Sequence, residues 1–306
     1  MSLDTAAAVG KLRSLTVAFD NGLEAARPIY PELCTVVPSD GADEEYGFVD
    51  GIPAVREWLG DRSFHTLRGA KFTLANKTWE NSIRVEKEHI EDDRMGLYPP
   101  ILSELGKEAA HHPDSLLFTI WDAGESSTCF DGQYFFDTDH SWGDSGTQSN
   151  DLTYDATDHT AVTEDEFRAA YHAARTAMLG FKRPNGEYFI RPTIRPLPNL
   201  LLVVPTGLEL VANLAINKSL IDAGETNIVL DKPRIMTSAS LSSSVKFDLF
   251  NLDGYMKPFV FQARRPLARQ MKGLDDREFK DVKFMTDARY NVGYLAWWKA
   301  VRTTFN

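Results

Sequence analysis

The sequence CFDGQYFFDTDH, residues 129–140, ends the stretch from Gly60 to Asp139 that decides the fold. Ahead of it come a strand-like segment, an acidic break at Glu91-Asp92-Asp93 and one long helical segment. A catalytic domain has little use for a long charged hairpin in front of its main helix. This order instead favours a chain that reaches across neighbouring copies of itself.

Residues 63–90 carry the strand-like pattern. Arg68-Gly69-Ala70 predicts a turn, and Phe72 then alternates with polar residues. Ile83 and Val85 alternate with charged residues in the same period of two, which is typical of a strand with one polar face. Few apolar side chains are available to bury both faces, so we expect a projecting hairpin.

Two helices are expected in the first half of the chain. Apolar residues spaced by three or four predict an amphipathic helix over residues 4–26, followed by a Pro-rich strap to Gly41. This helix is either an arm or a helix packed on its own domain. A longer helix opens near Tyr98 and ends at Gly124, and Pro113 is expected to interrupt or kink it because proline lacks a backbone donor.

The second half mixes helices and strands. Thr163 with Glu166, and Thr206 with Glu209, have the spacing of capping boxes at helix starts. The apolar run at residues 200–204 predicts a strand buried on both faces. After a Ser-rich connection at residues 238–244 the tail is β-rich, with one long strand from Val282. We therefore expect an α+β protein.

Composition limits the possible functions. The chain has 306 residues, 43% hydrophobic and 25% charged, which is typical of a folded protein. Its net charge of −11 argues against a protein that binds nucleic acid through its overall electrostatic field. Cys34 and Cys129 are too far apart for a disulfide framework or a cysteine-rich zinc site. The sequence predicts neither a secretory signal nor a membrane span, so we expect a soluble protein made in the cytosol.

Candidate chemistry is sparse. Asp131, Asp137, Asp139 and His140 have side chains that could ligate a metal, although acids that hydrogen-bond backbone amides in a loop are the simpler interpretation. His111 and His112 are adjacent, so a helix would point them in different directions. No phosphate-binding loop occurs. We expect no enzyme activity, no cofactor and no metal.

A series of short blocks resembles the major head subunits of Mu-like phages and prophages. The blocks occur in the expected order over residues 46–140, and weaker similarity reaches the C-terminus. One departure is Ser141, where proline is expected. The blocks are Tyr46-Gly47-Phe48 to Arg56–Arg62, Asn76–Glu80, Ile90–Asp93 with Gly96-Leu97-Tyr98, His112-Pro113-Asp114, Phe130–Gln133 and Phe135–His140.

The resemblance implies the Hong Kong 97-like major capsid fold. Its expected parts are an N-terminal arm at residues 1–61 and an extended hairpin loop at residues 62–93. A peripheral domain with a long spine helix follows at residues 94–160, then an axial domain at residues 161–240. Residues 241–306 would complete the peripheral domain with C-terminal strands.

The resemblance also implies self-assembly into hexamers and pentamers of an icosahedral virion head around double-stranded DNA, without sequence-specific binding. Scaffold, portal and decoration proteins are expected partners, and assembly is expected in a host bacterial cytoplasm. The alternatives are an encapsulin-like compartment and, from another class, a metal-dependent hydrolase using Asp137, Asp139 and His140. The residues expected at assembly contacts are Phe72, Trp79, Arg264, Arg265, Trp297 and Trp298. The two tryptophans suit either core or interface anchors, and the two arginines belong to a basic segment that could contact DNA phosphates or an acidic neighbour.

Overall fold

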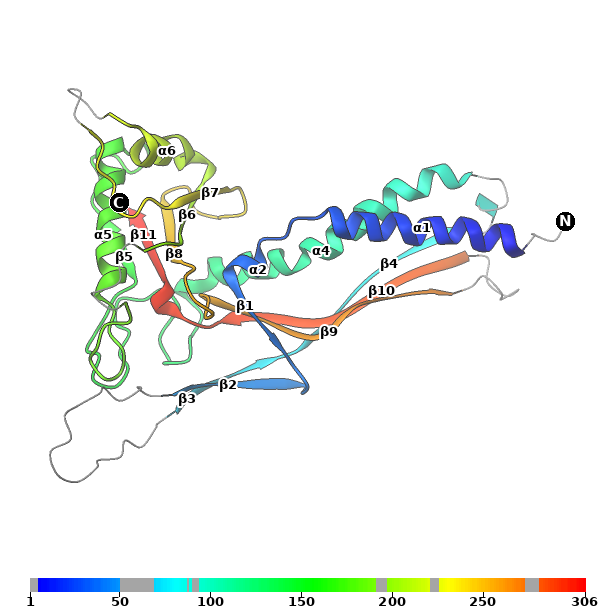
Figure 1. Cartoon of the computed structure of the whole chain (residues 1–306), viewed down its shortest axis with the longest axis horizontal. Helices are drawn as coiled ribbons and strands as arrows, with labels where there is room; N and C mark the ends of the chain where they lie inside the picture. Colours follow the sequence, from blue (N-terminus) through cyan, green and yellow to red (C-terminus); the bar gives the residue numbers. More distant parts are fainter. Residues whose placement is uncertain are drawn as a thin grey trace.

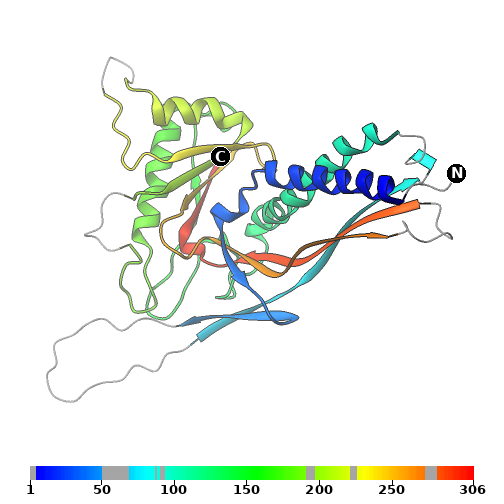
Figure 2. The same ribbon diagram turned by 45° about the vertical axis from the view of Figure 1, so that its right-hand side comes forward.

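The longest helix, α4 (Tyr98–Asp122), forms the spine of the molecule. The computed structural model describes residues 5–49, 69–86, 88–89, 94–190, 197–220, 226–272 and 281–306. Figure 1 shows two parts: a long lobe that contains α1 and α4, and a compact lobe that contains α5, α6 and the C-terminal strand. Figure 2 shows the same division after a turn of the molecule. No helix in the described ranges combines the length and apolar character needed to cross a bilayer.

The long lobe places two helices on a four-stranded sheet of order β1-β9-β10-β4. The long strands β9 and β10 are antiparallel, β10 pairs antiparallel with β4, and β1 runs parallel to β9. Alternate residues of β10 from Val282 to Ala288 are buried, and Val282 and Phe284 pack against residues of α1 and α4. The elements are α1 (Thr5–Ala25), α2 (Tyr30–Leu33), β1 (Cys34–Pro38), β2 (Asp43–Val49), β3 (Gly69–Ala75), β4 (Lys77–Glu86), η1 (Arg94–Leu97), α4, η2 (Ala123–Glu125), β9 (Phe259–Lys272) and β10 (Asp281–Tyr294).

The compact lobe is a five-stranded sheet of order β5-β11-β8-β6-β7 with two helices. Every residue of β6 is buried, which confirms the strand predicted from the apolar run at residues 200–204. The elements are β5 (Asp151–Tyr154), α5 (Glu164–Gly180), β6 (Leu200–Pro205), η3 (Thr206–Leu208), α6 (Glu209–Asn217), β7 (Arg234–Ser238), β8 (Lys246–Asn251), η5 (Trp297–Lys299) and β11 (Ala300–Phe305).

One of the two predicted capping boxes is present. The Thr163 hydroxyl accepts a hydrogen bond from the Glu166 amide, and the Glu166 carboxylate accepts one from the Thr163 amide. The second prediction is wrong. Thr206 begins the short 3-10 turn η3, and α6 starts three residues later with no side-chain cap, because Pro205 ends β6 directly before the turn.

The hairpin predicted at residues 62–93 is also wrong in its pairing. β3 pairs antiparallel with β2, which lies in the segment assigned to the arm, and β4 pairs with β10. Gly69 and Ala70 belong to β3 and form no turn. The backbone amide of Asn76 donates to the carbonyl of Ala42 at 2.9 Å, so the residues just before and just after the β2–β3 hairpin are neighbours. The predicted boundary at residues 61–62 and the cluster Glu91-Asp92-Asp93 lie outside the described residues.

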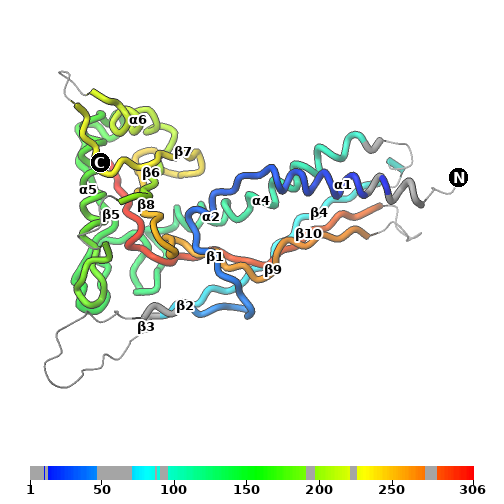
Figure 3. Tube along the Cα trace, in the orientation of Figure 1, coloured from blue at the N-terminus to red at the C-terminus, as the bar shows by residue number. Residues whose placement is uncertain are grey.

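The compact lobe also extends beyond residues 161–240, the range expected for the axial domain. Its sheet takes β5 from before that interval and β8 and β11 from after it. In the tube view of Figure 3 the C-terminal strand returns from the long lobe into the compact lobe. Alternation identifies a strand but not its partner, which is why the sequence could not assign these strands to a sheet.

The N-terminal helix α1 packs on its own chain, so of the two expectations for it the structure shows the packed helix. Leu15 and Phe19 join four residues of the long lobe in a separate apolar group, which we call the distal cluster. Its buried members are Leu15, Phe19, Val85, Leu102, Val282 and Phe284.

Two glycines allow α1 and α4 to approach closely. A Cβ on Gly22 would lie 2.0 Å from the carbonyl oxygen of Ser103, and one on Gly106 would lie 2.2 Å from that of Phe19. Both neighbours are backbone atoms and cannot move aside without shifting a helix. The crossing therefore requires glycine at both positions.

The spine helix is joined to the compact lobe by a buried ionic network. Arg302 of β11 donates from Nε and Nη2 to the Asp248 carboxylate of β8, at 2.8 and 3.0 Å. The indole Nε1 of Trp121, near the end of α4, donates to the same carboxylate at 2.7 Å. Arg302 also donates to Glu125 at 3.2 Å and lies 4.1 Å above the ring of Phe136. Burial alone would lower the pKa of Arg302, but Asp248 and Glu125 raise it above its usual value.

We expect Asp248→Asn to lower the free energy of unfolding by about 3–5 kcal/mol, because it leaves a buried guanidinium with a weaker partner. The control is Lys246→Met in the same network. Lys246 and Glu125 form a pair that is 27% and 34% exposed, so its loss should cost about 1 kcal/mol or less. Urea unfolding of both variants measures the difference. Equal costs would contradict the central role of the buried pair.

A second prediction concerns the helix crossing. Gly22→Ala should lower the free energy of unfolding by about 1–3 kcal/mol through overpacking. Gly10→Ala, in the same helix with nothing within 4 Å of its added Cβ, should be neutral or stabilising by up to ~1 kcal/mol through helix propensity. Thermal unfolding followed by circular dichroism distinguishes the two. A Gly22→Ala protein as stable as wild type would show that the helices do not cross this closely.

Candidate assembly surfaces

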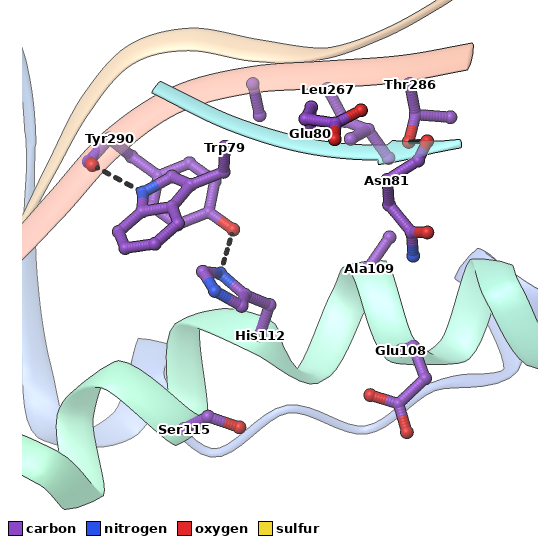
Figure 4. A pocket seen from close by; sticks show the side chains of 11 residues that line it. Trp79, Glu80, Asn81, Glu108, Ala109, His112, Ser115, Leu267, Thr286 and Tyr290 are labelled. Atoms are coloured by element: carbon purple, nitrogen blue, oxygen red, sulfur yellow. Dashed lines mark hydrogen bonds between the residues drawn. The ribbon is translucent and has the colours of Figure 1, made fainter. Parts of the chain in front are cut away.

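The predicted contact residue Trp79 lies on β4 and forms the wall of a pocket between the sheet and α4. Alternation along β4 directs Trp79 and Asn81 toward the helix, while Glu80 lies between them on the exposed side. The indole Nε1 of Trp79 donates to the carbonyl of Tyr290 on β10 at 3.0 Å. Figure 4 shows this bond and the His112 ring below the indole. The pocket has a volume of about 160 Å³ and is lined by residues of β4, β9, β10 and α4.

His112 supports the pocket from α4. Its ring centroid lies 4.5 Å from that of Trp79, and a hydrogen bond of 2.7 Å joins its Nδ1 to the hydroxyl of Tyr290. Burial lowers the pKa of His112, and the Glu108 carboxylate one turn away opposes this shift. The neighbouring His111 turns instead to Asp114, at 3.2 Å. The sequence-based expectation that the two histidines point in different directions is confirmed.

Phe72 lies on the β2–β3 hairpin and is partly buried. Its ring stacks on Tyr46 of the opposite strand, with centroids 5.0 Å apart. The Tyr46 hydroxyl donates to Gln262 of β9 at 2.9 Å, and Gln262 donates to the carbonyl of Leu74 at 3.1 Å. Burial raises the pKa of Tyr46 to about 12. The base of the hairpin is thereby held on the main sheet.

Arg264 and Arg265 both have acidic partners within the chain. Arg264 donates to the carbonyl of Ser39 at 3.0 Å and lies near Asp40, and Arg265 pairs with Asp287. Their side chains are 32% and 51% exposed, so part of each guanidinium faces solvent. The pairing neutralises much of the basic segment that the sequence suggested as a contact for phosphates. Their role in assembly stays a prediction.

Trp297 and Trp298 are only 1% and 7% exposed and therefore belong to the core. Trp297 stacks on His140 with ring centroids 3.9 Å apart, and Trp298 stacks on Phe189 at 4.4 Å. Neither ring offers a surface to a second copy. Of the two sequence-based interpretations, core anchor and interface anchor, the structure shows the core anchor. The prediction that the two tryptophans contact a neighbouring copy has no exposed ring to support it.

The proposed metal ligands are occupied by protein partners. His140 is fully buried, and its ring nitrogens face Asp131 at 2.7 Å and Asn150 at 3.2 Å. Asp137 accepts hydrogen bonds from the backbone amides of Tyr134 and Thr138. The described part of the chain contains no group of three ligating side chains suited to a metal. These hydrogen bonds match the simpler interpretation, in which His140 and Asp137 hold the loop in place.

The sequence of residues 11–163 matches the model of a family described as Mu-like prophage major head subunit gpT. The match covers half of the chain. The chain belongs to this family. The Mu-like prophage FluMu major head subunit of Haemophilus influenzae is 38% identical over 148 residues, which cover 48% of each chain. The major capsid protein of Escherichia phage Mu is 37% identical over 122 residues, which cover 40% of each. The matched region therefore spans at most half of these relatives.

Solved structures extend the likeness beyond the matched region. A similar chain occurs in the capsid of bacteriophage JBD30 decorated with minor capsid protein trimers. The two chains share 25% identity and a TM-score of 0.58, and the match covers 72% of this Mu-like family member and 93% of the JBD30 chain. A virus-like particle from Pyrococcus furiosus matches 95% of this chain and 98% of its own with a TM-score of 0.55. Its identity of 11% supports a shared fold alone. The α+β capsid fold expected from the sequence is confirmed.

Sequence reasoning missed the partners that shape the Trp79 pocket. His112 and Tyr290 come from elements distant from Trp79 in the chain. The helical spacing of Glu108, His112 and Ser115 was the available signal, since residues four and three apart share a helix face. Nothing in the sequence indicated which strand that face would cover.

The lowered pKa of His112 predicts a pH-dependent contribution to stability. The unfolded chain binds a proton near pH 6.5, whereas the folded chain binds it only at lower pH. The stabilisation is thus fully present above pH 6.5 and is lost as the pH falls through the folded pKa. His112→Gln should flatten the change in unfolding free energy between pH 7 and 5, relative to an exposed-site control, His159→Gln. Identical slopes in wild type and His112→Gln would contradict the assignment.

Proposed function

We propose that this chain is the major capsid protein of a tailed phage or prophage, a shell-forming subunit without enzyme activity. Copies associate as hexamers and pentamers of an icosahedral head that encloses double-stranded DNA. Membership of the Mu-like major head subunit family carries the proposal. The net charge of −11 is compatible with a wall that does not hold the genome by its overall field.

The shape of the chain supports self-association. In Figure 1 the β2–β3 hairpin extends from the main sheet and runs below the compact lobe. A neighbouring copy can cover the surface of such a limb that its own chain leaves exposed, and many modest contacts of this kind add up in a closed shell. We retain Phe72, Trp79, Arg264 and Arg265 as contact residues, since each has an exposed part.

The same proposal includes partners and location. The decorated JBD30 capsid carries minor capsid protein trimers, which supports a decoration protein for this head as well. A scaffold protein and a portal are expected as for other heads, with assembly in the host bacterial cytoplasm and a final place in the virion. The division into arm, hairpin loop, peripheral and axial domains also stays a proposal, with the hairpin shifted to β2–β3.

The test is negative-stain electron microscopy of the purified chain and of a hairpin deletion. Because Ala42 and Asn76 are hydrogen-bonded neighbours, a Gly-Asn-Gly turn can replace residues 43–75 without moving either end. We expect closed shells from the wild type and none from the deletion, which should remain folded by circular dichroism. Shells that enclose other proteins and no DNA in infected cells would favour a compartment. A wild-type chain that stays monomeric at every concentration would overturn the proposal.

A further inference from the structure

The strand β4 is an edge of the four-stranded sheet with a free side. It pairs with β10, and among the described residues no strand pairs with its other side. In Figure 4 the β10 and β9 ribbons both lie on one side of β4. The strand has ten residues, KTWENSIRVE, without proline or glycine. An edge of this length exposes a row of backbone donors and acceptors that a further strand can pair with.

The charges on the exposed face of β4 are complementary to themselves. When two copies of β4 run antiparallel about a two-fold axis through Ser82, Glu80 of each copy lies opposite Arg84 of the other. Thr78 then lies opposite Glu86, and Ser82 opposite itself. Opposite charges in directly facing positions stabilise antiparallel strands. One two-fold contact thus produces two ion pairs.

Neighbouring registers lack this match. An axis through Asn81 places Glu80 opposite Ser82, and leaves Arg84 opposite Thr78. An axis through Ile83 places Glu80 opposite Glu86, which creates two pairs of like charges that repel each other. Only the register through Ser82 pairs every Glu80 with an Arg84.

The current partners of both charged residues are easily exchanged. Arg84 lies 3.4 Å from Asp281, but its side chain is 68% exposed. Glu80 accepts a hydrogen bond from the exposed hydroxyl of Ser82 at 2.8 Å. Exposed pairs of this kind contribute little within one chain, so neither side chain is committed.

The helices leave room for the contact. α4 packs over β10 and reaches Trp79 of β4, so the α4 helices of two paired copies would be separated by two to three strand spacings, about 10–14 Å. Packed helices need about 8–10 Å. The helix-facing side of the joined strands would continue across the axis, with Trp79 opposite the partner's Val85 and Asn81 opposite the partner's Ile83.

We propose that two copies of this chain associate through their β4 edges, antiparallel about a two-fold axis at Ser82, with reciprocal Glu80–Arg84 ion pairs. This proposal rests on the self-association proposed above and assigns to it a specific surface and register. It joins two four-stranded sheets into one sheet of eight strands.

Cysteine crosslinking tests the register. In full-length Ser82→Cys protein the two introduced thiols would face each other, at a Cβ separation of about 4.5–5.5 Å, and mild oxidation should give a covalent dimer. The control is Thr78→Cys on the same exposed face. Thr78 is eight residues from Glu86, so the partner's Thr78 would be about 27 Å away along the strand. Burial raises the pKa of Cys34 and Cys129, which disfavours the reactive thiolate of the native cysteines.

Charge reversal tests the ion pairs in the Ser82→Cys background. Glu80→Arg or Arg84→Glu alone turns two attractive pairs into two repulsive ones, and each should lower the dimer yield roughly tenfold. The double variant restores both pairs in reversed order and should recover most of the yield. Circular dichroism checks that each variant is folded. Dimers from Thr78→Cys at the same yield, or a double variant no better than the singles, would refute the proposed register.

Microscopy of the same samples separates this proposal from the proposed function. Closed shells without a Ser82 crosslink would refute the β4 contact and leave the shell intact. Covalent dimers without shells would support the contact and contradict the shell. Absence of both would overturn both.

Discussion

The link between Arg302, Asp248 and Trp121 determines how the two lobes are joined. Each group comes from a different element, and each would be costly to bury alone, since a buried charge or polar N–H requires a partner. The geometry of β8, β11 and the end of α4 is therefore fixed together. The aromatic core around this link continues from the compact lobe into the base of the long lobe, and Trp121 contacts both Phe250 and Phe259. The two lobes are therefore joined by aromatic packing as well as by the buried hydrogen bonds.

Beyond that junction, interactions become weaker and more exposed. The distal cluster is small and separate from the main core. Ion pairs such as Arg265–Asp287 and Arg269–Asp20 lie at the surface, where each contributes little. The β2–β3 hairpin is attached at its base, through Gln262, through the Asn291 side chain, which donates to the carbonyl of Ala75 at 2.7 Å, and through the backbone bond at Asn76. This gradient from a rigid junction to loosely held limbs is what a subunit needs when neighbouring copies complete its surface.

The sequence predicted elements well and their partners poorly. Helical spacing identified α1, α4 and α5, and the apolar run identified β6, because these signals are local. The pairing of β3 with β2, and the return of β11 to the compact sheet, depend on contacts between distant residues that alternation does not encode. Trp79 was predicted to contact a neighbouring copy, but its pocket was not predicted, since His112 lies on another element. For Trp297 and Trp298 the sequence left core and interface open, because a large aromatic side chain suits both, and their burial places them in the core.

The position of Pro113 in the spine helix has a mechanical consequence. α4 continues through this proline, but the carbonyl of Ala109 receives no backbone hydrogen bond from it. Ala109 packs against the distal cluster, while Leu117, one turn after Pro113, belongs to the main core. The weakest point of the helix thus coincides with the gap between the two apolar groups. A bend at Pro113 would change the curvature of the long lobe, and the contacts of His112 and Asp114 on either side of the proline oppose it.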